Sequence, residues 1–407
     1  MNSIFYGKML CIAAPLSFLL LLSLIPSSSL VLGGCKNYDS VKKCPIESPC
    51  CNNGWCSNDP RFCSTGCDPD NSYSPKSCYP TAYCVNLYDD FNAPKMINAQ
   101  NYSGNPNTYD WTSDFTPDYA SSSNSNLVLS MKYDGTHKNE VGNYQGFGST
   151  VSSTRWMQYG WVTARIKTAS SNLGVVSSFI TKNLEGDEID FEWVGLAPSE
   201  VQSNFYWQGV LDYSHANHHN LSGDSSATYY NYGIEWMPDH ITWYIDGNPV
   251  RTIKLEDTKA SNGSFLFPSG PQRIQFSVWD GGEAAKGTAD WAGTPTDWSD
   301  KNRVYTMYVD WVNITCYYQG NETATWPPAG YGPPNVTTNG TTSYQTLGTG
   351  QATLGNGGGN TVGSYNTSSI PPPDNSAAVI SSQLSVALFS LISTSVIASI
   401  SFTFKHL

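Results

Sequence analysis

Short runs of apolar and aromatic residues fill the chain between residues 83 and 316, and several alternate with polar residues at a period of two. Such alternation is typical of strands that bury one face of a sheet. An Asp-Gly pair at Asp246-Gly247 separates two of these runs and predicts a tight hairpin. Roughly 230 residues of this pattern predict one all-β sandwich of two packed antiparallel sheets. The clearest runs are SNLVLSMKY, GWVTARIKT, GVVSSFITK, HITWYIDG, QRIQFSVWD and RVYTMYVDWVNIT.

One predicted strand, in the segment EGDEIDFEWVG, is unusual in having an acidic face. Glu188, Asp190 and Glu192 share that face, and the apolar residues that alternate with them share the other. Alternation by itself favours a solvated strand whose outer face is acidic. However, only 13% of the chain is charged, and no Lys or Arg lies between these three acids. A pair of carboxylates with opposite protonation states is what glycoside cleavage requires, so we interpret the strand as a candidate catalytic element.

A second strand, QRIQFSVWD, places polar residues and a tryptophan on one face. This pattern predicts a strand that lines a cleft, with Gln275 and Trp279 as the pair most suited to contact a sugar. For a single tryptophan, packing in the core is an equally good interpretation.

The composition excludes one broad class of function and favours another. The chain has 407 residues, 33 acidic against 21 basic, and a formal charge of −12. A nucleic-acid-binding protein needs a basic surface, so we expect no nucleic-acid partner. Aromatic residues make up 13% of the chain. Few charges with many aromatic and amide side chains suit a neutral carbohydrate ligand.

Both ends of the chain have the pattern of processing signals. Residues 1–33 combine Lys8, an apolar run and a small-residue stretch, which predicts a secretory signal peptide cleaved between Ser27 and Gly34. An N-terminal membrane anchor is the alternative. Residues 376–407 form a hydrophobic tail without a flanking basic cluster, which predicts a GPI-anchor signal with Asn375 as the attachment site. A membrane-spanning helix is the alternative there.

The segment before this tail, residues 319–375, is rich in Ser, Thr, Gly, Asn and Pro and predicts a glycosylated linker without a core. Removal of both signals takes away two lysines and leaves a formal charge of −14. Secretion also agrees with eight Asn-x-Ser/Thr sequons. They are Asn101, Asn220, Asn262, Asn313, Asn321, Asn335, Asn339 and Asn366.

The segment 34–84 holds most of the cysteines. Of the 11 cysteines, Cys11 lies in the signal peptide, nine lie between Cys35 and Cys84, and the last is Cys316. An even set of ten in a secreted chain should be fully paired. So small a segment with few apolar residues needs disulfides to hold its structure, although eight cysteines allow 105 connectivities.

The run C-x8-C-x5-CC-x4-C-x6-C-x3-C-x10-C in this segment resembles a hevein-type chitin-binding module. In that family aromatic rings stack on N-acetylglucosamine, and Trp55 and Phe62 occupy the matching positions. Asn52 stands where the family has Ser, and the loop before Trp55 is one residue short. A disulfide cap without sugar affinity is an equally good interpretation. The resemblance implies the pairs Cys35–Cys51, Cys44–Cys56, Cys50–Cys63 and Cys67–Cys78, and leaves Cys84–Cys316 to join the ends of the next domain.

Residues 85–318 resemble glycoside hydrolase family 16, a β-jelly-roll family, and in particular its fungal Crh-type chitin–glucan transglycosylases. The motif DEIDFEWVG carries the resemblance, with YGWVTARIKTASSNLGVVSSFITKN, NFYWQG, YYNYGIEW, ITWYIDG and FSVWDGG around it. The resemblance implies a retaining mechanism in which Glu188 is the nucleophile, Glu192 the general acid/base and Asp190 the assisting residue. It also implies that Glu192, Trp279, Thr288 and Trp291 bind sugar, and Trp207 is a further candidate.

The remaining patterns predict no metal and no cofactor. His215, His218 and His219 lack a Cys or an acid at ligand spacing and predict a surface loop. The glycine-rich stretch 348–359 follows no strand and is interpreted as linker.

We therefore expect a monomeric, GPI-anchored cell-wall transglycosylase that cleaves chitin and transfers it to β-glucan. The alternatives are a β-glucan or chitin hydrolase that uses the same carboxylates, and a non-catalytic wall lectin.

Overall fold

The computed structural model describes residues 31–33, 35, 43–52, 54–138, 142, 144–321, 325–336 and 342–344. Residues 1–30 of the expected signal peptide, most of the linker with its glycine-rich stretch, Asn375 and the tail 376–407 lie outside the described residues. Among the residues that are described, none forms a helix of the length and apolar character that crossing a membrane requires.

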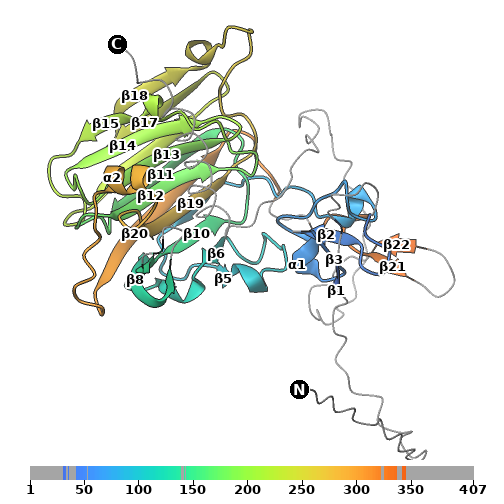
Figure 1. Ribbon diagram of the computed structural model, residues 1–407. Helices are drawn as coiled ribbons and strands as arrows, with labels where there is room; N and C mark the ends of the chain where they lie inside the picture. Colours follow the sequence, from blue (N-terminus) through green and yellow to red (C-terminus); the bar gives the residue numbers. More distant parts are fainter. Residues whose placement is uncertain are drawn as a thin grey trace, which may run out of the picture.

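Two large sheets pack on each other to form a sandwich (Figure 1), which confirms the predicted fold class. The eight-stranded sheet has the order β15 (Asn217–Asn220), β14 (Glu200–Tyr206), β13 (Glu188–Val194), β12 (Val175–Lys182), β19 (Arg273–Asp280), β10 (Ser149–Ser153), β6 (Trp111–Phe115) and β5 (Met96–Asn98). β5 and β6 pair in parallel, and the other pairs of this sheet are antiparallel.

The nine-stranded sheet forms the second layer and is antiparallel. Its main path has the order β18 (Asn248–Lys254), β17 (His240–Ile245), β16 (Tyr230–Trp236), β11 (Gly160–Lys167), β20 (Val304–Cys316), β8 (Leu127–Lys138) and β7 (Ala120–Ser122). Beside this path, β4 (Leu87–Asp89) pairs with β20, and β9 (Tyr144–Phe147) pairs with β8.

The core lies between the sheets and follows from the period-two pattern. Along β11 and β19, buried residues alternate strictly with half-buried ones. Aromatic rings fill the space between the layers: the rings of Phe179 and Phe276 stack 5.2 Å apart, and Phe191 meets Tyr232 edge-on at 5.4 Å. Each fully buried ring of this kind contributes about 1.5–3 kcal/mol relative to exposure, so the core fixes the register of the strands that carry it.

The predicted hairpin turn joins β17 to β18. Asp246 and Gly247 both have positive φ angles, 47° and 78°. A two-residue turn with both φ positive matches the right-handed twist of the flanking strands, and Asn, Asp and Gly tolerate it best. The Asp-Gly prediction is therefore confirmed.

Helices are short, as the scarce helical periodicity predicts. The α-helices are α1 (Pro60–Cys63) and α2 (Lys286–Ala292). Single turns of 3-10 helix occur at Pro75–Ser77, Ala99–Asn101, Pro117–Tyr119, Tyr213–His215 and Leu255–Thr258.

The cysteine-rich module contains a three-stranded sheet of β1 (Val31–Gly33), β3 (Trp55–Ser57) and β2 (Cys50–Asn52). β1 pairs with β3 along its whole length. Residues 31–33 belong to the segment 1–33 that is expected to be a signal peptide.

Five disulfides hold the described part of the chain, and their pairing is the one that the hevein-type resemblance implies. The module has Cys35–Cys51, Cys44–Cys56, Cys50–Cys63 and Cys67–Cys78, and the sandwich has Cys84–Cys316. Eight of these sulfurs supply most of the two small clusters at the centre of the module. The disulfides therefore take the place of an apolar core there, and their density is typical of proteins that fold in oxidising compartments.

Replacing both Cys84 and Cys316 by Ser should lower the free energy of unfolding of the sandwich by about 2–5 kcal/mol, because the bridge closes a very long loop. The sequence separation of the two cysteines is 232 residues. Urea unfolding of the wild-type and double-variant proteins measures the difference. Equal midpoints would show that this bridge contributes nothing to stability.

Part of the segment expected to be an unstructured linker contacts the folded domains. The backbone N–H of Gly320 donates to the carbonyl of Cys84 at 2.6 Å, and that of Gly332 donates to the carbonyl of Lys76 in the module at 2.8 Å. The hairpin of β21 (Pro334–Val336) and β22 (Thr342–Tyr344) begins two residues after Gly332. The chain therefore returns to the module after it leaves the sandwich.

Candidate active site

Strand β13 lies inside the eight-stranded sheet, between β12 and β14. Ile189, Phe191 and Trp193 are fully buried in the core of the sandwich, so Glu188, Asp190 and Glu192 point to the opposite, outer face of the sheet. A register slip of one residue would bring three acids into the core, which fixes the strand in place. The structure therefore brings the three predicted residues to one face of one strand.

The acidic face is more enclosed than the sequence pattern predicts. Glu188 is 6% exposed and Asp190 is 1% exposed, while Glu192 is half-buried. The solvated strand that alternation alone favours would leave all three carboxylates exposed. Instead, buried neighbours on β12 and β14, Ile180, Asn204 and Tyr206 among them, surround the first two.

Glu188 has a cationic partner in Lys182, which lies directly opposite on β12. The Lys182 Nζ atom lies 2.5 Å from Glu188 Oε2. The Lys182 side chain is 24% exposed and that of Glu188 is 8% exposed, so the ion pair is largely shielded from solvent. An ion-paired carboxylate is an anion, and an anion is what a nucleophile must be.

Asp190 lies between the two glutamates and is the most buried of the three. Burial, and then the charges of Glu192 and Glu188, hold the pKa of its carboxyl well above the usual range. Its Oδ2 atom has no hydrogen-bond partner among the described residues. A protonated Asp190 avoids a third buried negative charge and supplies an O–H donor between its neighbours.

Glu192 is the carboxylate with the environment of a proton donor. Burial and the negative charge of Glu188 raise its pKa to about 7, against the opposing effects of a hydrogen bond from Ser178 and the charge of Lys182. Ser178 Oγ lies 3.1 Å from Glu192 Oε1. Glu188 is therefore paired with a cation, while Glu192 can hold a proton near neutral pH. Acid catalysis by two carboxylates needs this difference.

Ser178 should control the proton affinity of Glu192. Its hydroxyl favours the charged carboxylate, so Ser178→Ala should raise the pKa of Glu192. A hydrogen bond to a charged group contributes about 1.5–3 kcal/mol, which corresponds to about one pH unit or more. If Glu192 acts as the acid, the alkaline limb of the kcat/KM profile should move to higher pH by about that amount. Ser178→Thr keeps the hydroxyl and should leave the limb in place; a limb unmoved in Ser178→Ala would contradict the role.

An aromatic wall borders Glu192 on one side. The rings of Trp279 on β19 and Trp291 on α2 stack 5.9 Å apart. Trp279 Nε1 donates to Ser178 Oγ at 3.2 Å, and Trp291 Nε1 donates to Gln202 Oε1 at 2.8 Å. Gln202 lies directly opposite Glu192 on β14. The two tryptophans are thus hydrogen-bonded to the immediate neighbours of the candidate acid.

Helix α2 reaches this position because a small apolar cluster holds it on the outer face of the sheet. Val176, Val194 and Ala292 form the buried centre of that cluster, and both tryptophans pack against it. The loop that follows α2 passes close to Gly174, which has a φ of 78° and where a Cβ atom would lie 2.0 Å from Thr296 Oγ1. Only glycine fits there.

The other residues predicted to contact sugar, Gln275, Thr288 and Trp207, lie on or next to three different elements. Gln275 is half-buried and is the Cα partner of Ile180, which pairs with Asp190, so it shares their row on the outer face. Thr288 lies on α2, one turn before Trp291, and is half-buried. Trp207 follows the last residue of β14 and is half-buried. Their roles in sugar binding stay predictions.

Two tyrosines on the opposite side of the carboxylates were missed by the sequence reasoning. Tyr206 lies directly opposite Glu188 on β14, and its ring meets that of Tyr213 edge-on at 6.3 Å. Tyr213 is 63% exposed, and burial and the charge of Glu192 raise its pKa. Residues 202–206 do not alternate apolar and polar residues, so no pattern signals Tyr206, and Tyr213 begins a single turn of 3-10 helix.

In the module, the two predicted stacking residues differ in exposure. Trp55 is 54% exposed, whereas Phe62 is half-buried and packs against a cluster of disulfide sulfurs. Asn52 is buried, and its amide donates to the carbonyls of Phe62 and Thr65. Trp55 is therefore better placed than Phe62 to offer a free ring face.

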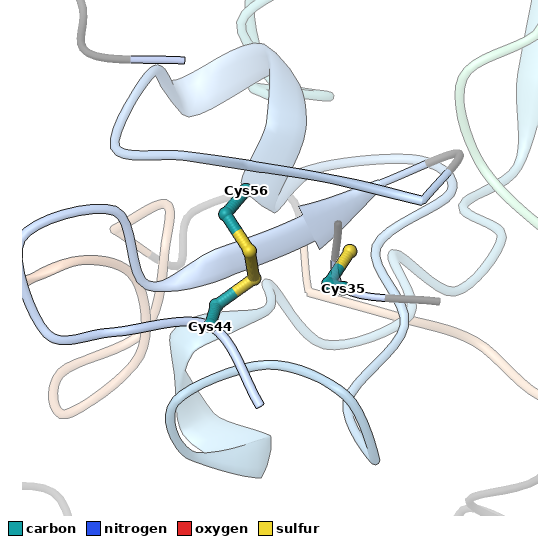
Figure 2. Close-up of side chains that lie close together, drawn as sticks. All are labelled: Cys35, Cys44 and Cys56. Atoms are coloured by element: carbon teal, nitrogen blue, oxygen red, sulfur yellow. A yellow bond between two sulfur atoms is a disulfide. The ribbon is translucent and has the colours of Figure 1, made fainter. Parts of the chain in front are cut away.

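Cys35, Cys44 and Cys56 place three sulfur atoms within 4.8 Å of one another (Figure 2). Each sulfur belongs to a disulfide. A cysteine binds a metal as a free thiolate, and these sulfurs are bonded to other sulfurs, so the group fits a covalent framework.

The three histidines pair separately with other groups. His215 stacks on Phe205, His218 contacts Glu200 at 2.6 Å, and His219 contacts Ser203 Oγ at 2.8 Å. His219 is buried in β15, which differs from the expected surface loop.

A groove of about 790 Å³ lies beside Leu173, Glu283 and Trp298. Most of its lining comes from Tyr133, Leu173, Glu283, residues 295–299 and Lys301, and none of the three carboxylates contributes to it.

A sandwich that carries two glutamates in unlike environments on one strand, beside an aromatic wall, has the features of a glycoside-cleaving enzyme. The chain belongs to the glycosyl hydrolases family 16, whose model matches residues 106–313.

Fungal proteins are among its relatives. The chain is 36% identical over 286 residues to Crh-like protein 2 of Aspergillus fumigatus, which covers 67% of this chain and 61% of that protein. It is 36% identical over 297 residues to Congo red hypersensitive protein 2 of Saccharomyces cerevisiae, covering 70% and 60%. The chain thus spans about three fifths of the length of these relatives. A solved apo Crh5 transglycosylase is 26% identical, with 63% of this chain and 91% of that chain covered and a TM-score of 0.48.

Proposed function

We propose that this protein is a retaining cell-wall transglycosylase that cleaves chitin and transfers the new end to β-glucan. The single observation that carries the proposal is the split environment of the carboxylates on β13. Glu188 is paired with Lys182, while burial and the charge of Glu188 raise the pKa of Glu192 to about 7. Membership of a glycoside hydrolase family and the resemblance to Crh-like proteins support the class of substrate.

In this mechanism Glu188 attacks the anomeric carbon while Glu192 protonates the oxygen of the leaving sugar. A glycosyl-enzyme forms, and Glu192 then removes a proton from the acceptor hydroxyl as that hydroxyl displaces Glu188. A retaining pair needs its carboxyls about 5–5.5 Å apart. Backbone positions four apart on a strand are about 13 Å apart, so the two side chains must lean toward one sugar. Asp190, protonated between them, assists by donating a hydrogen bond.

Transfer rather than hydrolysis requires that a sugar hydroxyl reaches the glycosyl-enzyme before water does. Aromatic walls on both sides of the carboxylates, Trp279 with Trp291 and Tyr206 with Tyr213, support this. A sugar held between such rings has a high effective concentration at the reacting carbon. Gln275, Thr288 and Trp207 complete the proposed sugar contacts.

The test uses the full-length secreted protein with chitin oligomers and a fluorescent β-glucan acceptor. Transfer is supported by a labelled product of higher mass that does not form when the enzyme has been boiled. Shortened chitin oligomers without labelled product would indicate a hydrolase, and retention on chitin without either product would indicate a lectin. The anomeric form of the first product, followed by NMR, tests retention of configuration.

We also propose that the protein acts outside the plasma membrane as a monomer, held by a GPI anchor at Asn375 or by a link to wall glucan. The five disulfides support an oxidising compartment. The described sequon residues Asn101, Asn220, Asn262, Asn313 and Asn321 are exposed, as glycosylation requires. The exposed ring of Trp55 supports a contact between the module and chitin.

A further inference from the structure

The outer face of the nine-stranded sheet carries a sequon in the middle of a strand. Asn313 lies on β20 between Val312 and Ile314, which are 0% and 4% exposed and point into the core. Asn313 and Thr315 therefore point outward, and both are exposed. Sequons are usually found in surface loops, so the surroundings of this one need an explanation.

Aromatic side chains flank Asn313 on this face. Tyr88 on β4 is its Cα partner and is 63% exposed. Trp311, two residues earlier on β20, stacks on Tyr88 with ring centroids 6.2 Å apart and planes 29° apart. On the other side, Trp161 of β11 is the Cα partner of Thr315, and its Nε1 donates to Thr163 Oγ1 at 2.7 Å.

We propose that Asn313 carries an N-linked glycan and that the first N-acetylglucosamine of this glycan packs on the Tyr88–Trp311 pair. The proposal rests on the proposed secretory route. In the transfer, the Asn313 amide nitrogen bonds to C1 of a lipid-linked oligosaccharyl diphosphate. The C1–O bond to the diphosphate breaks, the diphosphate leaves on the lipid, and the amide nitrogen loses one proton.

The geometry suits this packing. Side chains of directly opposed strand residues have Cβ atoms about 4.5–5.5 Å apart, so a sugar joined to Asn313 reaches the ring of Tyr88 without any change of backbone. A pyranose has an apolar face of C–H groups that covers aromatic area, and an aromatic pair left open to water marks a binding surface. The glycan of the same chain is the occupant already tethered at that place.

A second sequon provides a matched control. Asn220 also lies on a strand, β15, and is also exposed, but its Cα partner is Glu200. An acidic neighbour offers a sugar no aromatic surface. Glycosylation at Asn220 should therefore affect solubility without stabilising the fold, while glycosylation at Asn313 should do both.

The experiment measures glycan occupancy and melting temperature of the full-length protein secreted from a yeast host. Mass spectrometry of peptides should find Asn313 occupied. Trimming with an endoglycosidase that leaves one N-acetylglucosamine should keep the melting temperature. Asn313→Gln should lower it by about 2–4 °C, the shift typical of a small change in free energy for a domain of this size, and Asn220→Gln should leave it unchanged.

A double-mutant cycle separates packing on the glycan from packing on Trp311. Tyr88→Ala should lower the melting temperature more in glycosylated protein than in the Asn313→Gln background. An equal loss in both backgrounds, or an unoccupied Asn313 beside an occupied Asn220, would overturn the proposal. Loss of binding to insoluble glucan in Tyr88→Ala with Asn313 bare would also overturn it and identify an external polysaccharide as the occupant. If every sequon is bare in the secreted protein, the glycan proposal fails on its own, whereas the transglycosylase assay does not depend on any of these outcomes.

Discussion

Glu188→Gln should reduce kcat/KM for chitin transfer by at least about 10³-fold, because an amide cannot form the glycosyl-enzyme. The substitution preserves shape but removes the anion that lies 2.5 Å from Lys182. It also removes a negative charge that raises the pKa of Glu192, so the pKa of Glu192 should fall in the variant. A donor with an activated leaving group should not restore activity, since the nucleophile itself is missing.

The control for this variant is Glu200→Gln on β14. Glu200→Gln is the same Glu-to-Gln change on the strand next to β13. Glu200 pairs with His218 and not with the carboxylates of β13. Its activity should remain within a factor of two or so of wild type, as is usual for surface substitutions. Thermal melts should show both variants folded. A Glu188→Gln protein with wild-type transfer would refute the assignment of the nucleophile.

The elements that the sequence predicts well are those in which one face of a strand is buried. The run at 160–168 becomes β11 and the run at 272–280 becomes β19, each with the predicted alternation. The same logic placed Glu188, Asp190 and Glu192 on one face, since the core residues of β13 fix its register. Periodicity carries this information because it is local to each strand.

The parts that the sequence could not predict depend on contacts between distant segments. Lys182 and Ser178 belong to an apolar run that gives no sign of chemistry, and only the pairing of β12 with β13 places them beside the two glutamates. Helix α2 is a short element without amphipathic periodicity, and its position depends on the apolar cluster around Val176. The burial of Asp190 likewise follows from the neighbouring strands rather than from its own.

Glu192→Gln should reduce transfer from chitin by about 10²–10⁴-fold, the usual contribution of a general acid. Unlike Glu188→Gln, this variant should still form a glycosyl-enzyme from a chitin oligomer with a 4-nitrophenyl leaving group, because such a group departs without a proton. Rapid release of nitrophenol followed by slow turnover would be the signature. Equal loss with both donors would show that Glu192 is not the acid.

The pH profile gives the same assignment an independent test. Burial and the charge of Glu188 raise the pKa of Glu192 to about 7, and the acid must be protonated for the first step. In the wild-type protein kcat/KM for chitin should therefore fall as the pH rises through about 7, since the proton is lost there. In Glu192→Gln, release of nitrophenol should not show this limb. A limb near pH 7 that persists in the variant would assign the titration to another group, of which Asp190, with its raised pKa, is the nearest.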